Sequence, residues 1–135
     1  MLLDLGKLSN TRFQKIDITV PNGSSAGGFG ASVQLDRQFN KIIGIGFFEV
    51  ADGGIAQNYN VGAKTDRQVW VDPITYFAWQ AKEGVSPMAK YFAVDIEYAS
   101  GDTFYMILNT GAALSADLVG QMVLVLQKSN TATPR

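Results

Sequence analysis

The sequence YFAVDIEYASGDTFYMILN, residues 91–109, decides the fold class of this chain. In its first half apolar and polar residues alternate, which is the period-2 pattern of a strand with one buried face. In its second half residues 104–108 are all apolar, so both faces of that strand need cover. Gly101 and Asp102 suit a tight turn, because glycine accepts a positive φ and aspartate bonds its own backbone. We predict a hairpin that requires further sheet packed against it.

Six other segments have strand patterns and are separated by turn residues. They are residues 15–20, 31–36, 41–50, 59–64, 67–71 and 122–127. The glycine-rich residues 24–30 before the second of them are predicted to form a loop. Eight short strands at regular spacing predict a mainly β fold, an antiparallel sandwich or barrel.

Residues 73–83 fit two structures. Asp72 and Pro73 resemble a helix N-cap and first helical residue, and the apolar residues that follow have helical spacing up to Gly84. The aromatic residues within 75–79 favour a strand instead. We predict at most one short helix here and leave the strand as the alternative.

Composition restricts the class of protein. The chain has 135 residues, 47% of them apolar, which is enough for one domain with its own core. Its 11 basic and 12 acidic residues do not cluster and give a net charge of −1. We therefore expect no direct contact with nucleic acid and no basic membrane-binding face.

The chain contains neither cysteine nor histidine. Disulfides and thiolate metal sites are excluded, and the commonest general base and transition-metal ligand are missing. Residues 1–10, MLLDLGKLSN, lack the pattern of a signal peptide, so we expect synthesis in a host cytoplasm without a leader. Residues 104–126 are apolar overall, but the carboxylate of Asp117 disfavours a membrane span.

Candidate chemical sites are few. Asp95 and Glu97 share one strand face, as a hydrolase carboxylate pair would, although a solvated outer face explains them more simply. The glycines of residues 27–30 and 44–46 lack the flanking residues of a phosphate-binding loop. Turn aspartates have local backbone roles. We predict no catalytic residue, no metal site and no cofactor.

Three strands are apolar on both faces, namely residues 41–50, 104–108 and 122–126. The outer faces of a sandwich are normally exposed to solvent, so such strands lie beneath other parts of the chain or against another subunit. Gly44 and Gly46 share one face, which indicates a bend or a close neighbour over that face. Burying an additional large apolar side chain gains about 1.5–3 kcal/mol, so we predict association.

The order of these features resembles the small single jelly-roll capsid proteins of tailless icosahedral bacteriophages, especially those at fivefold vertices. The resemblance lies in an N-terminal arm followed by KIIGIGFFEV, RQVWVDP, SGDTFYMILN and GQMVLVLQ, within residues 12–128. It implies an eight-stranded jelly roll and a pentamer in the virion capsid. It also implies contact with the major capsid protein or a spike, with an internal membrane near by.

We accordingly predict an arm over residues 1–12, one jelly-roll domain over residues 13–128 and a tail over residues 129–135. The predicted function is that of a non-enzymatic virion structural protein, a vertex or minor capsid subunit. The residues predicted to contact partners are Leu2, Leu3, Leu5, Phe13, Trp70, Trp79 and Tyr105.

Two alternatives remain open from the sequence. Trp70 and Trp79 side by side on a flat face would indicate a carbohydrate- or receptor-binding module. A concave pocket around Asp95 and Glu97 would indicate a small hydrolase.

Overall fold

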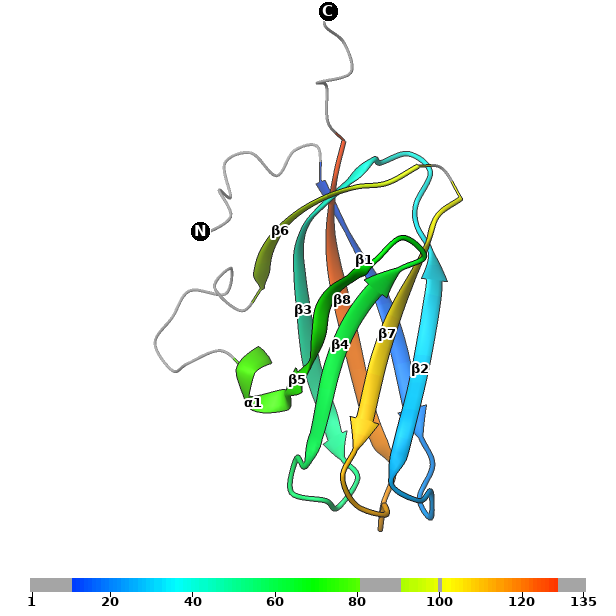
Figure 1. Cartoon of the computed structure of the whole chain (residues 1–135), viewed down its shortest axis with the longest axis vertical. Coiled ribbons are helices and arrows are strands. Elements are labelled where there is room, and N and C mark those ends of the chain that lie inside the picture. The colour runs from blue at the N-terminus through cyan, green and yellow to red at the C-terminus, as the bar shows by residue number, and fades with distance from the viewer. Residues whose placement is uncertain (1–10, 81–90, 100, 129–135) are drawn as a thin grey trace, which may run out of the picture.

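The computed structural model describes residues 11–80, 91–99 and 101–128, which form a sandwich of two four-stranded antiparallel sheets (Figure 1). The strand order in one sheet is β1-β8-β3-β6, with β1 at Thr11–Val20, β8 at Leu118–Gln127, β3 at Lys41–Asp52 and β6 at Phe92–Glu97. The order in the other is β2-β7-β4-β5, with β2 at Gly27–Gln34, β7 at Thr103–Thr110, β4 at Tyr59–Thr65 and β5 at Val69–Thr75. A short helix, α1 at Tyr76–Trp79, follows β5.

The chain crosses between the sheets at nearly every connection. Among the described strands, β4 and β5 are the one pair that is consecutive in the sequence and bonded in the same sheet. All the pairs are antiparallel. Two four-stranded sheets with this strand order make an eight-stranded jelly roll. The predicted fold class is confirmed.

The predicted hairpin of residues 91–109 is wrong, although its turn is present. Gly101 has φ +91°, and the Asp102 carboxylate accepts a hydrogen bond from the Ala99 amide at 2.9 Å. The strands on either side, however, belong to different sheets: β6 pairs with β3, while β7 pairs with β2 and β4. The turn reverses the chain across the sandwich because a local turn determines direction and does not determine the partner strand.

The core lies between the two sheets and is built from alternate residues of each strand. The largest fully buried side chains are Phe104, Leu35, Ile42, Ile45, Ile96, Met106, Leu108, Leu118, Met122, Leu124, Leu126 and Val20. Because successive side chains of a strand point to opposite faces, the remaining residues form two outer faces. Those faces are where contacts with other molecules are available.

Helix α1 closes one side of the sandwich. Thr75 caps it by accepting a hydrogen bond from the Phe77 amide at 3.4 Å. Trp79 donates its indole N–H to the Val61 carbonyl in one sheet at 3.1 Å, and its ring meets that of Phe92 in the other sheet, with centroids 4.7 Å apart. The predicted short helix is confirmed over Tyr76–Trp79, but its predicted start at Asp72 and Pro73 is wrong because both residues lie in β5, and the alternative strand over 75–79 is wrong beyond Thr75. Residues 81–83 lie outside the described part of the chain. The strand continues to Thr75 and a single helical turn follows it.

Several predicted boundaries change. Residues 27–30, predicted as loop, are the start of β2, because their backbone pairs with β7. Residues 11–12, predicted as the end of an arm, pair with β8 as part of β1. Residues 1–10 and 129–135 lie outside the described part of the chain, so the arm and the tail stay predictions.

Candidate functional site

An aromatic cluster lies on the outer face of the β1-β8-β3-β6 sheet. We call it the outer patch and define it as Phe13, Phe48, Tyr91 and Val123, with Val125 beneath them. The ring centroids of Phe13 and Tyr91 are 6.3 Å apart, and those of Phe48 and Tyr91 are 5.7 Å apart. Phe13 is 52% exposed, which is high for a phenylalanine on a sheet. The outer patch is therefore partly open to solvent.

Register explains why these side chains meet. Phe13 pairs with Val125 across β1 and β8, and Val125 pairs with Gly44 across β8 and β3. Gly46 pairs with Val123 in the neighbouring row. A β-carbon on Gly46 would lie 2.7 Å from the Tyr91 ring, so the absence of a side chain lets the ring lie on the strand.

The burial of Val125 shows how far this face is already covered. Its exposed fraction is 0% although it points away from the core between the sheets. Val123 and Phe48 are half-buried. The predicted excess of apolar sheet is thus partly hidden within one copy and partly left exposed.

Polar pairs border the outer patch. The Lys15 ammonium lies 3.6 Å from the Asp17 carboxylate on β1, and the Gln121 side-chain amide donates a hydrogen bond to the same carboxylate at 2.8 Å. On the opposite side, Lys41 pairs with Asp95 at 3.0 Å. An apolar centre within a polar rim is the usual composition of a protein–protein contact surface.

The residues predicted for contacts fall into different environments. Phe13 lies in the outer patch, and Tyr105 is half-buried on the outer face of the other sheet. Trp79 is 3% exposed and belongs to the core, while Trp70 packs against the core and donates its indole N–H to the Thr65 hydroxyl at 2.9 Å. Both tryptophans are therefore left out of the contact surface proposed below. The predicted residues Leu2, Leu3 and Leu5 lie outside the described residues.

Phe48 and Tyr91 are not among the residues predicted to contact partners. One signal was available, because Gly44 and Gly46 on a single face indicated a close neighbour. That neighbour over Gly46 is the ring of Tyr91. Its identity depended on β6 lying beside β3, which the sequence pattern does not show.

The carboxylates of Asp95 and Glu97 lie on the exposed face of β6. Asp95 is engaged with Lys41, and Glu97 sits opposite Lys41 in the register. The arrangement fits the solvated outer face that the sequence also allowed.

Two further properties concern the described residues alone. No group of three or more acidic residues is close enough to hold a metal ion. No helix there has the length and hydropathy needed to cross a bilayer.

A partly buried polar cluster lies at the other end of β3. The Glu49 carboxylate accepts hydrogen bonds from the Tyr59 hydroxyl and from the Gln57 amide, both at 2.9 Å. Burial, and then the bond to Glu49, raise the pKa of Tyr59 far above its ordinary value. Burial also raises the pKa of Tyr76 and of Tyr98.

We expect these tyrosines to make the fold sensitive to alkali. A folded-state pKa above the unfolded value of about 10 gives stability that is complete below pH 10 and is lost as pH rises past it. The free energy of unfolding should therefore fall steeply above about pH 10. Circular dichroism and tyrosinate absorbance should change together in an alkaline titration. Tyrosinate absorbance that rises fully near pH 10 while the β signal persists would contradict this expectation.

Comparison with known proteins gives no family. No protein-family model matches the chain, and no curated protein matches it. Two solved structures that share a similar arrangement are dimeric latent PorU from Porphyromonas gingivalis and FlhE. For PorU the TM-score is 0.38 and the identity 8%, over 87% of this chain and 13% of that chain. For FlhE the TM-score is 0.39 and the identity 10%, over 88% of this chain and 99% of that chain. Such values support no function, and neither structure points to a bacteriophage capsid protein.

Proposed function

We propose that this chain is a non-enzymatic structural subunit of a virion, at a capsid vertex or in a minor capsid position, and that it associates through the outer patch. The observation that carries the proposal is the exposed ring of Phe13 beside Tyr91 and Phe48, on a sheet face that a sandwich normally wets. Such a patch on a small soluble domain is typical of an interaction site.

The jelly-roll strand order is the second support. This architecture occurs in viral capsid proteins, and also in lectin domains and cupins, so the fold alone does not decide among them. The exposed outer patch favours the capsid class, because a shell subunit must bury apolar surface against its neighbours. A homo-oligomer, with five copies at a vertex, and contacts with a major capsid protein or spike belong to the same proposal.

The direct test is the mass of the protein in solution over a range of concentrations. The chain has a mass of 14.6 kDa, and we expect multiples of it to accumulate as concentration rises, with a pentamer the species sought. A chain that remains a monomer up to millimolar concentration would contradict self-association.

Phe13→Thr should weaken that association specifically. The substitution removes an exposed ring from the outer patch and keeps a residue that favours strands. Losing about 1.5–3 kcal/mol of burial free energy at each contact should raise the dissociation constant roughly 10- to 150-fold. Sedimentation equilibrium measures this change.

Phe77→Ala is the matched control. Phe77 is 55% exposed, much like Phe13, but belongs to α1 and not to the outer patch, and alanine suits a helix. Its association should remain at the wild-type level. Equal weakening in both variants would mean that the outer patch is not the specific contact surface.

A further inference from the structure

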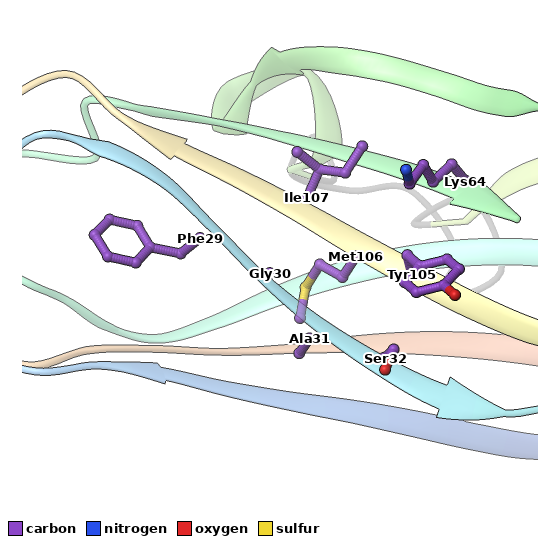
Figure 2. A pocket seen from close by; sticks show the side chains of 8 residues that line it. All are labelled: Phe29, Gly30, Ala31, Ser32, Lys64, Tyr105, Met106 and Ile107. Carbon is purple, nitrogen blue, oxygen red and sulfur yellow. The ribbon is translucent and has the colours of Figure 1, made fainter. Parts of the chain in front are cut away.

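A hollow of about 270 Å³ lies on the β2-β7-β4-β5 sheet, the sheet opposite the outer patch (Figure 2). Three strands line it: β2 through residues 29–32, β7 through residues 105–107 and β4 through Lys64. Because side chains alternate along each strand, those on the outer face of the sheet at this hollow are Ser32, Tyr105, Ile107 and Lys64. Gly30 pairs with Ile107 and carries no side chain, so Ile107 is uncovered on that side.

The hollow combines an apolar floor with polar walls. The Lys64 ammonium lies 5.4 Å from the centre of the Tyr105 ring. Interaction with the Asp66 carboxylate raises the pKa of Tyr105. Ser32 is the partner of Tyr105 across β2 and β7, and its small side chain leaves the space beside the ring open.

Next to the hollow, two asparagine side chains lie side by side on the outer face of the same sheet. Asn109 pairs with Asn60 on one side and with Gly28 on the other. Both asparagine side chains are exposed and have donors and acceptors to offer. A ligand on Ile107 and Tyr105 would thus have hydrogen-bonding groups at its edges.

We propose that this hollow binds a neutral sugar residue of a glycan. A hexose ring presents an apolar face of C–H groups and an edge of hydroxyls, which match the floor and the walls respectively. A purely apolar ligand would remove water from Ser32, Lys64 and the amides without replacing their hydrogen bonds. The opposite charges of Lys64 and Asp66 flank Tyr105, so an anionic group gains no net attraction.

The site differs from the tryptophan platform considered from the sequence, since Trp79 is in the core and Trp70 is directed to Thr65. It is also independent of the proposed capsid function. The outer faces of a sandwich point in opposite directions, so a copy held through the outer patch keeps this hollow open. Sugar binding and self-association are therefore measured separately, and either can fail alone.

The test is a titration of the ¹⁵N-labelled full chain, followed by amide chemical shifts. The probes are D-glucose, D-galactose and N-acetyl-D-glucosamine, with benzoate as an apolar anionic ring for comparison. We expect at least one sugar to bind with a millimolar dissociation constant, as a ligand of one ring should. The shifts should centre on residues 30–32 and 105–107.

Two variants locate the site. Ser32→Leu fills the hollow and Tyr105→Leu removes its ring, so each should weaken sugar binding at least tenfold. Thr19→Leu makes a matched change at an exposed position on β1, in the other sheet, and should leave binding unchanged. The proposal is overturned by the absence of shifts with all three sugars at tens of millimolar, by equal binding of benzoate, or by undiminished binding in Ser32→Leu.

Discussion

Replacing Phe47 by alanine is expected to lower the free energy of unfolding by about 3–5 kcal/mol. The Phe47 side chain is 2% exposed and lies between the sheets. Its ring meets those of Tyr59, Tyr76 and Trp79 edge-on, with centroids 6.2, 6.1 and 6.5 Å apart. Truncation loses the transfer free energy of the ring and these contacts, and leaves a cavity at the point where α1 joins both sheets.

Gly120 provides a sharper form of this test. A β-carbon on Gly120 would overlap the Phe47 ring, so Gly120→Ala alone should destabilise the fold by about 1–3 kcal/mol through overpacking. In the Phe47→Ala background the same methyl group enters vacated space. The double variant should therefore be less destabilised than the two single variants predict by addition.

Urea or guanidinium unfolding of the four proteins measures this coupling. Val50→Ala is the control, since Val50 is 72% exposed and its truncation should change stability by less than about 0.5 kcal/mol. Strict additivity of the Phe47 and Gly120 effects would show that the two positions do not contact one another.

Gly62→Ala is the second substitution for which a large effect is expected. A β-carbon on Gly62 would lie 2.8 Å from the Pro73 nitrogen and 2.9 Å from the Val71 carbonyl oxygen. These are backbone atoms of β5, which cannot move away without breaking their pairing with β4. We expect a loss of about 1–3 kcal/mol, with displacement of β5 and of α1 after it.

Tryptophan fluorescence reports this displacement directly. The chain has two tryptophans, Trp70 on β5 and Trp79 on α1. Their emission should shift to longer wavelength in Gly62→Ala as their rings become more exposed to water, and the midpoint temperature of thermal unfolding should fall.

Gly28→Ala is the matched control in the same sheet. Its β-carbon would lie 3.1 Å from the end of the Asn109 side chain, which can rotate away. Stability and emission should therefore stay close to those of the wild type. A Gly62→Ala protein that behaves like this control would show that β5 does not press on Gly62.

The strand pattern was predictable because it is local. Alternation in residues 15–20 and 122–127 placed strands close to β1 and β8, and the turn at Gly101 was recognised from two residues. Glycines misled the prediction at residues 27–30, because a glycine-rich strand at a sheet edge looks like a loop until its partner, β7, is known.

The candidate site was predictable only in part. Phe13, predicted as a contact residue, is exposed in the outer patch, while Trp79, chosen for the same aromatic character, packs into the core. Burying a large ring is favourable in a core and in an interface alike, so residue type does not separate them. Tyr91 joined the outer patch only through the pairing of β6 with β3.

For this protein, strand-like patterns along the chain predict eight strands in an antiparallel sandwich or barrel, because adjacent side chains of a strand point to opposite sides whatever lies beside them. The jelly roll itself was implied by the family resemblance. The partner of each strand, the two sheets joined by the Gly101 turn and the aromatic rings left in solvent come from the folded molecule alone. Those properties depend on contacts between segments as distant as Phe13 and Val125, whose free energies no local pattern contains.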